Sequence, residues 1–274
     1  MTVKVAIQGD KGSYSDEAAQ LFFGDYEPVF LRTFNDVFDL VESGEADMGV
    51  VPVENTTTGS IRKVLNLLLE RDVYAIGEVK VKVDHALLAP KGATLDNIKY
   101  VYSHPEAISQ CEGFLSSRDW QVIPRYDTAG SAREVAERAD PSYAAIASER
   151  TAQLYGLSVL LREIQDVKPN ITRFYVISRD AQWPRDADTT SAFFATRHVP
   201  GALWRALGAF AKRNINLLWL ESRPIRGEPW NYSFFVEFEG SMHEDYVQEA
   251  LKELEGQSVW VKLVGSYKRW RRIS

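Results

Sequence analysis

Short apolar runs alternate with amphipathic segments along the chain up to residue 178. Apolar side chains recur every three or four residues from Phe34, which follows the N-cap candidate Thr33, and again from Ile61 to Leu68. This spacing predicts two amphipathic helices. The apolar runs are short enough for buried strands and lie at residues 3–7, 48–53, 73–81, 98–102, 122–124 and 143–147. Strands that alternate with helices predict an α/β domain.

A second pattern begins after residues 179–188, where several charged residues and Pro184 interrupt the apolar rhythm and predict a linker. The predicted elements that follow are a strand at 191–196, a helix at 201–213, strands at 215–221 and 231–239, a helix at 244–255 and a strand at 259–264. This βαββαβ order is typical of a ferredoxin-like α+β domain with both helices on one face of an antiparallel sheet. We therefore expect two domains, at 1–180 and 189–274.

Composition narrows the class of protein. The 274 residues are 45% hydrophobic and 26% charged, which is ordinary for a globular protein with one large or two smaller cores. A net charge of −6 argues against a nucleic-acid partner. The one concentrated basic stretch is short and consists of Lys268, Arg269, Arg271 and Arg272.

No apolar run approaches the roughly 20 residues that a membrane helix needs, and the apolar N-terminal run is too short for a signal peptide. We therefore expect a cytoplasmic protein without a membrane partner. The single cysteine, Cys111, excludes an intramolecular disulfide.

The usual motifs of metal, nucleotide and covalent-serine sites are missing. The four histidines, His85, His104, His198 and His243, have no second ligand at helical or hairpin spacing. The sequence has no P-loop, dinucleotide fingerprint or nucleophile elbow. We therefore expect neither a metal nor a cofactor.

Four turns rich in hydroxyl, amide and glycine groups follow predicted strands, at residues 9–15, 52–60, 103–105 and 127–131. In an open α/β sheet, ligands collect beyond the carboxyl ends of the strands, where helix N-termini offer free N–H groups. One such turn alone would most often only cap a helix. Four of them in one domain favour a shared anion-binding cleft, although they do not identify the ligand.

A fifth polar segment, residues 170–174, enters a predicted strand. Because side chains alternate along a strand, Thr172 and Phe174 should face one side and Arg173 the other. The first two can then line a pocket while Arg173 joins an ion pair. By composition alone this is an ordinary strand start.

These segments, in this order, resemble the prephenate dehydratase family. Residues 9–19 are similar to its opening motif, 49–56 to the segment with its Glu-Asn pair, 103–107 with Gln110-Cys111 to a third motif, and 170–174 to its Thr-Arg-Phe signature. Residues 201–203 and 221–224 resemble the phenylalanine-binding motifs of its regulatory ACT domain. The likeness is co-linear over nearly the whole chain.

Some positions depart from the family pattern. The chain has Ser13-Tyr14 where members commonly have Thr-Phe, which keeps a hydroxyl and an aromatic ring. After Asn55 it has three threonines where members have a serine and later an acidic residue, which argues against a carboxylate role at Thr58. The chorismate mutase domain of some relatives is absent from this sequence, so we expect dehydratase activity without mutase activity.

The resemblance implies a two-lobed, periplasmic-binding-protein-like catalytic domain, with its second lobe at about 80–160, and a ferredoxin-like ACT domain. It implies the conversion of prephenate into phenylpyruvate, with Thr172 as the catalytic donor to the leaving hydroxyl. Asn55, Thr56 and Ser13 would hold substrate oxygens, and Phe174 would line the ring pocket. Ser103, Thr128 and Arg173 complete the expected substrate site. Arg173 remains open between a functional and a structural role, and Glu54 between orienting Asn55 and capping the turn.

The resemblance also implies L-phenylalanine as an effector, bound between two ACT domains of a homodimer or homotetramer. The expected effector residues are Gly201, Ala202, Leu203, Asn216, Leu217, Glu221 and Ser222. Without the resemblance, Glu221 and Arg223 would be a surface pair and Gly201 a tight turn. Two alternatives for the whole chain stay open: an arogenate dehydratase and a non-catalytic amino-acid-binding module.

Overall fold

The computed structural model describes all residues except 1, 226, 228–231 and 271–274. The described chain divides into two units that are not contiguous in sequence. Unit 1 comprises residues up to 64 and residues 79–174, and unit 2 comprises residues 65–78 and those from 175 onward. Helix α3 (Arg62–Glu70) and strands β5 (Tyr74–Lys82) and β11 (Ile171–Ser178) each continue from one unit into the other.

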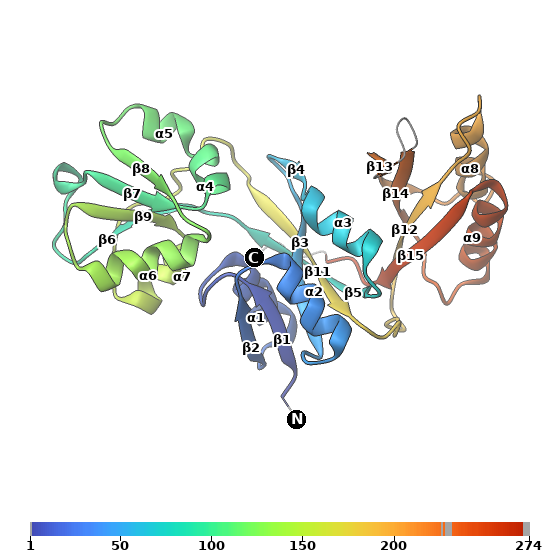
Figure 1. Cartoon of the computed structure of the whole chain (residues 1–274), viewed down its shortest axis with the longest axis horizontal. Helices are drawn as coiled ribbons and strands as arrows, with labels where there is room; N and C mark the ends of the chain where they lie inside the picture. Colours follow the sequence, from blue (N-terminus) through green and yellow to red (C-terminus); the bar gives the residue numbers. More distant parts are fainter. Residues whose placement is uncertain (1, 226, 228–231, 271–274) are drawn as a thin grey trace. The chain divides into compact units, whose positions relative to one another are not determined.

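The first lobe of unit 1 is built on parallel strands (Figure 1). Strand β1 (Lys4–Gln8) pairs in parallel with β2 (Glu27–Leu31) and with β3 (Met48–Asn55). The sheet order is β11-β3-β1-β2, and the short β4 (Gly59–Ser60) pairs with β3. Helices α1 (Tyr14–Phe23) and α2 (Phe34–Ser43) connect these strands. As predicted, Thr33 caps α2, and Asp36 completes a reciprocal capping box.

The second lobe of unit 1 has a five-stranded sheet in the order β10-β6-β9-β7-β8. The strands are β6 (Ala86–Ala89), β7 (Tyr100–Ser103), β8 (Gln121–Pro124), β9 (Tyr143–Ala147) and β10 (Ser158–Leu161). The helical segments are η1 (Leu95–Asn97), α4 (Pro105–Gln110), α5 (Glu112–Ser116), α6 (Thr128–Arg138) and α7 (Glu149–Tyr155). Helices α4 and α5 cover one face and α6 and α7 the other (Figure 1). The lone cysteine, Cys111, is buried in the core under α4 and α5.

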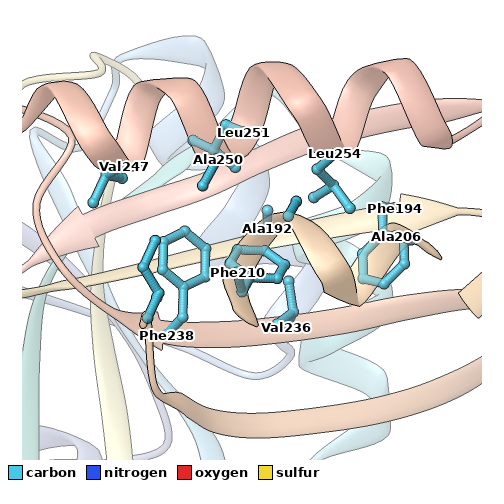
Figure 2. Close-up of a cluster of buried hydrophobic side chains, with 12 residues drawn as sticks. Ala192, Phe194, Ala206, Phe210, Val236, Phe238, Val247, Ala250, Leu251 and Leu254 are labelled. Carbon is cyan, nitrogen blue, oxygen red and sulfur yellow. The ribbon is translucent and has the colours of Figure 1, made fainter. Parts of the chain in front are cut away.

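Unit 2 contains the predicted βαββαβ order. Its elements are β12 (Thr189–Ala195), α8 (Ala202–Ala211), β13 (Leu217–Pro224), β14 (Tyr232–Glu239), α9 (Asp245–Gln257) and β15 (Trp260–Tyr267). The four strands pair antiparallel in the order β13-β14-β12-β15. Phe210 of α8 and Leu254 of α9 belong to one core with Phe194 and Val236 of the sheet, so both helices cover the same face (Figure 2). The predicted fold class, two-lobed α/β plus ferredoxin-like α+β, is confirmed.

Strand β5 joins the sheet of unit 2 through a very close approach at Gly265. Gly265 of β15 pairs in parallel with Ala75 of β5. A Cβ on Gly265 would lie 2.0 Å from the carbonyl oxygen of Ala75, which no real side chain tolerates. Glycine at this position therefore permits the β5–β15 pairing.

Unit 2 also buries a carboxylate. The hydroxyls of Tyr175 and Tyr267 lie 2.6 and 2.7 Å from Oε2 of Glu237, and 2.6 Å from each other. All three side chains are essentially inaccessible to solvent. A buried carboxylate is tolerated when donors satisfy its oxygens, and the two phenols supply such donors.

The structure contains strands that the apolar pattern did not predict, namely β2, β4, β6 and β10. Strand β2 begins with an exposed Glu-Pro pair, and β4 has two residues, so neither gives an apolar run. In the basic stretch, Lys268 pairs with Asp188 and Arg269 pairs with Glu239. Arg271 and Arg272 lie outside the described residues. Residue 231, at the start of a predicted strand, also lies outside them. Among the described helices, none is long and apolar enough to cross a membrane.

Candidate functional site

A cavity of about 370 Å³ lies in unit 1 and is lined by residues of both lobes. Its apolar lining includes Phe34, Ile61, Val83 and Phe174. Its polar lining includes Ser13, Tyr14, Ser15, Asn55, Thr58, Ser60, His85, His104, Glu106, Gln110, Asp127, Thr128 and Thr172. Among the described residues, no three His, Cys, Asp or Glu side chains gather as they would around a metal ion.

Strand β11 presents alternate side chains to the cavity. Thr172 and Phe174 line the cavity, whereas Arg173 between them lies within 3.2 Å of the Glu54 carboxylate. Thr172 is 9% exposed, so its hydroxyl is largely shielded from water yet reaches the cavity wall. The period of two along a strand accounts for this separation.

The amide of Asn55 fixes the hydroxyl of Thr172. Oδ1 of Asn55 accepts the backbone N–H of Thr57 at 2.9 Å and that of Thr58 at 3.2 Å, which orients the amide. Its Nδ2 therefore donates to Oγ1 of Thr172 at 3.0 Å and to Oδ1 of Asn170 at 2.7 Å. Because Asn55 is the donor in this contact, the contact does not use the hydroxyl hydrogen of Thr172, which remains available to a ligand in the cavity.

The hydrogen bonds continue from Asn55 through two more amides, which we call the amide row: Asn55, Asn170 and Gln110. Nδ2 of Asn170 donates to Oε1 of Gln110 at 2.8 Å. Nε2 of Gln110 in turn lies 3.4 Å from the Glu106 carboxylate. Thr172 thus stands at one end of the row and Glu106 at the other.

The amide row also determines the protonation of His85. Oε1 of Gln110 is an acceptor and lies 2.8 Å from Nε2 of His85, so this nitrogen carries the hydrogen. The other nitrogen, Nδ1, lies 3.2 Å from the hydroxyl of Tyr14, which also donates to the Asp84 carbonyl oxygen at 3.0 Å. Burial lowers the pKa of His85, so the neutral Nε2–H form prevails at neutral pH.

This histidine gives the stability of the protein a pH dependence. Because burial lowers its pKa in the folded state, the unfolded chain takes up a proton below about pH 6.5 that the folded chain does not. The free energy of unfolding should therefore fall as the pH drops below that value. Between pH 7.5 and 5.5, the free energy of unfolding should fall by roughly 1 kcal/mol less in His85→Gln than in the parent protein. Urea unfolding at the two pH values measures both changes. Equal losses in both proteins would contradict this role.

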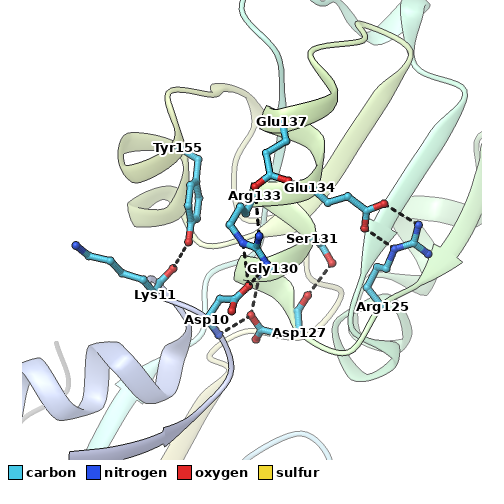
Figure 3. A network of polar contacts seen from close by, with 10 residues as sticks. All are labelled: Asp10, Lys11, Arg125, Asp127, Gly130, Ser131, Arg133, Glu134, Glu137 and Tyr155. Atoms are coloured by element: carbon cyan, nitrogen blue, oxygen red, sulfur yellow. Dashed lines mark hydrogen bonds and ion pairs between the residues drawn. The ribbon is translucent and has the colours of Figure 1, made fainter. Parts of the chain in front are cut away.

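The loop after β1 is fixed against α6 and α7 of the second lobe (Figure 3). The Asp127 carboxylate caps α6 by accepting the N–H of Gly130 at 2.8 Å and also accepts the N–H of Asp10 at 3.2 Å. Arg133 of α6 pairs with Asp10 at 2.9 Å, and the hydroxyl of Tyr155 donates to the Lys11 carbonyl at 2.9 Å. Burial raises the pKa of Asp127. These contacts hold the two helix starts beside the cavity.

The cavity brings together five of the predicted substrate-site residues: Ser13, Asn55, Thr128, Thr172 and Phe174. Ser13 caps α1, and Thr128 is the first residue of α6. Both therefore combine a hydroxyl with a helix start, where N–H groups favour negative charge.

The other three predicted substrate-site residues lie outside the cavity lining. Thr56 accepts the N–H of Ile171 at 2.9 Å. Ser103 is fully buried and donates to the Ile146 carbonyl at 2.7 Å. Arg173 faces Glu54, as described above. Each thus makes a contact that holds the protein itself together.

Sequence reasoning missed several lining residues, chiefly Tyr14, His85, Glu106 and Gln110. Tyr14, Glu106 and Gln110 lie in segments that resemble family motifs, which was an available signal. His85 has no local signal, because its partners Tyr14 and Gln110 lie 71 and 25 residues away in the chain.

Three of the seven predicted effector residues line one pocket of unit 2, and the other four do not. Gly201, Ala202 and Leu203 line a pocket of about 450 Å³ at the start of α8, together with the exposed Trp204. Gly201 has a positive φ of 76° that favours glycine. Asn216, Leu217, Glu221 and Ser222 do not line this pocket, and all but Asn216 belong to the edge strand β13. Glu221 pairs with Arg223 at 3.1 Å.

Comparison with known proteins identifies the family. Residues 5–182 match the family model described as prephenate dehydratase, and residues 192–256 match that of the ACT domain. The bifunctional chorismate mutase/prephenate dehydratase of Aquifex aeolicus is 41% identical over 97% of this chain and 73% of its own length. The chloroplastic arogenate dehydratase/prephenate dehydratase 2 of Arabidopsis thaliana is 38% identical over 97% of this chain and 72% of its own.

Among the solved structures that are similar to this chain, two with high TM-scores each cover 97% of it. Prephenate dehydratase from Arthrobacter aurescens in complex with L-Phe has a TM-score of 0.88, 30% identity and 90% of its chain covered. A protein described as a quorum-quenching acylase has a TM-score of 0.86, 31% identity and 98% of its chain covered. Because this fold is shared with a protein described by another activity, the family assignment rests on the sequence match. On that match, the chain belongs to the prephenate dehydratase family.

Proposed function

We propose that the chain is a prephenate dehydratase, with residues 1–180 as the catalytic domain and 189–274 as the regulatory domain. The substrate occupies the cavity of unit 1 and is converted into phenylpyruvate, carbon dioxide and water. The observation that carries this assignment is the Thr172 hydroxyl, whose oxygen accepts a hydrogen bond from Asn55 and whose hydrogen is free to point into the cavity.

The chemistry needs one positioned donor. The bond between ring carbon and hydroxyl breaks, and the departing oxygen takes up one proton to become water. The bond to the ring carboxylate breaks at the opposite carbon, and its electron pair enters the ring, which becomes aromatic. Thr172 donates a hydrogen bond to the departing oxygen, while the net proton comes from solvent, because a threonine hydroxyl is a weak acid. Positioned donation of this kind contributes typically ~10²–10⁴-fold to a rate.

The substrate carboxylates are bound without a basic side chain. Among the lining residues that the structure describes, none is lysine or arginine. Hydroxyl groups such as those of Ser13 and Thr128, together with the N–H groups at the starts of α1 and α6, serve as the donors. Phe174 supplies an apolar wall for the ring. Asn55 acts by positioning Thr172, because its Nδ2 is already engaged by Asn170 and Thr172.

The proposal extends to regulation and location. L-phenylalanine binds at the pocket around Gly201, Ala202 and Leu203, as the glycine-started helix and the resemblance to ACT motifs support. The edge position of β13 suits pairing with a second copy, so that Asn216, Leu217, Glu221 and Ser222 contribute to the site in a homodimer or homotetramer. We place the protein in the cytoplasm.

An ultraviolet assay for phenylpyruvate tests the function directly. The purified protein incubated with prephenate should form phenylpyruvate far faster than a buffer control, and added L-phenylalanine should change the rate. Binding without turnover of either prephenate or arogenate would instead favour a non-catalytic binding module. A rate that does not respond to L-phenylalanine would remove the regulatory part of the proposal alone.

A further inference from the structure

The cavity carries negative charge that no basic side chain offsets. Glu106 and Asp127 are its acidic lining residues, and the described lining contains no lysine or arginine. The Asp127 carboxylate is engaged by the N–H groups of Gly130 and Asp10. Among the described residues, the carboxylate of the exposed Glu106 has only the amide of Gln110 within hydrogen-bond distance, at 3.4 Å, and no basic side chain within ion-pair distance.

Neighbouring histidines do not neutralise Glu106. His104 precedes it as the N-cap of α4 and also lines the cavity. Burial lowers the pKa of His104 and that of His85, so both rings are neutral at pH 7. No protonated histidine among these neighbours therefore offsets the Glu106 carboxylate.

The amide row places Glu106 relative to the reacting groups. Thr172 lies at one end of the row and Glu106 at the other, with Asn55, Asn170 and Gln110 between them. In the substrate, the departing hydroxyl and the three-carbon side chain are on opposite carbons of the ring. A substrate bound with its hydroxyl at Thr172 and its ring along the amide row would have its side chain at the Glu106 end.

We propose that Glu106 is a specificity-determining residue that favours arogenate, whose side chain carries an ammonium group, over prephenate, which carries a keto oxygen there. This inference rests on the proposed dehydratase function and on Thr172 as the donor. A carboxylate attracts the ammonium group of the amino form and gains nothing from the keto group. It also repels the neighbouring side-chain carboxylate, which the ammonium group offsets only in arogenate.

The test compares Glu106→Gln with the parent protein on both substrates. Initial rates give kcat/KM for phenylpyruvate formation from prephenate and for phenylalanine formation from arogenate. Glutamine has the same shape without the charge, so the prephenate-to-arogenate ratio of kcat/KM should rise about tenfold, as expected for loss of one partly solvated charge contact. Glu106→Asp, which keeps the charge, should leave the ratio within about threefold of the parent.

Glu112→Gln is the matched control, because Glu112 is an exposed residue of α5 outside the cavity lining and its loss changes the net charge equally. The prephenate-to-arogenate ratio of kcat/KM should be the same in Glu112→Gln as in the parent protein. An unchanged ratio in Glu106→Gln, while the parent turns over either substrate, would overturn this inference and leave the dehydratase function intact. If the parent turns over neither substrate, the proposed function fails and the role of Glu106 fails with it.

Discussion

Replacing Thr172 with valine is expected to lower kcat for phenylpyruvate formation by about 10²–10⁴-fold with little change in KM. Valine keeps the branched shape on the strand and removes the hydroxyl that the departing oxygen needs. The substrate carboxylates still find their donors at the starts of α1 and α6, so binding persists. Steady-state kinetics on the ultraviolet signal of phenylpyruvate measure both constants.

Thr172→Ser is the matched control for this experiment. Serine keeps the oxygen within reach of the Asn55 amide, which now lies 3.0 Å from the Thr172 oxygen, so part of the activity should remain. Circular dichroism should show both variants folded, because neither substitution adds volume at this buried position on β11. Near-parental turnover in Thr172→Val would remove Thr172 from the reaction.

Gly265→Ala is expected to lower the free energy of unfolding by about 3 kcal/mol. The added methyl would lie 2.0 Å from the Ala75 carbonyl oxygen and 2.8 Å from its carbonyl carbon. These are backbone atoms that cannot rotate away, so β15 must separate from β5 to make room. Urea unfolding of the parent and the variant gives the difference.

Gly256→Ala provides the opposite case in the same unit. Gly256 is exposed near the end of α9, and a methyl there meets nothing within 4 Å. Alanine is a better helix former, so this variant should gain about 0.5–1 kcal/mol. If both alanine variants changed stability by the same amount, the close approach at Gly265 could not be the cause.

The fold could be predicted for those elements whose apolar spacing and capping residues match the way they pack in the structure. Thr33 followed by apolar residues at helical spacing gave α2 together with its capping residue. The βαββαβ order of unit 2 followed from apolar runs of ordinary length. Strand β2 was missed because an edge strand needs few buried side chains, and the exposed Glu-Pro pair at its start gave no apolar run.

The sequence predicted a cleft shared by separate turns, and Ser13, Asn55 and Thr128 of those turns line one cavity. The alternation of side chains on one strand placed Thr172 and Phe174 together from the sequence alone. The amide row was not predictable, because Asn55 and Asn170 are 115 residues apart and Asn170 and Gln110 are 60 apart. Only the folded chain brings Asn55, Asn170 and Gln110 together, whereas Glu106 is four residues from Gln110 on α4 and lies in a segment that resembles a family motif.

The interleaving of the two units limits modular dissection of the chain. A fragment beginning at residue 189 omits residues 65–78 and 175–188, which belong to its own unit. It would keep the buried Glu237 and Tyr267 but lose Tyr175, one of the two phenols beside that carboxylate. Gly265 would likewise lose Ala75 as its strand partner. Transfer of unit 2 to another protein would therefore have to include residues 65–78, which lie between the two lobes in the sequence, and residues 175–188, which follow the second lobe.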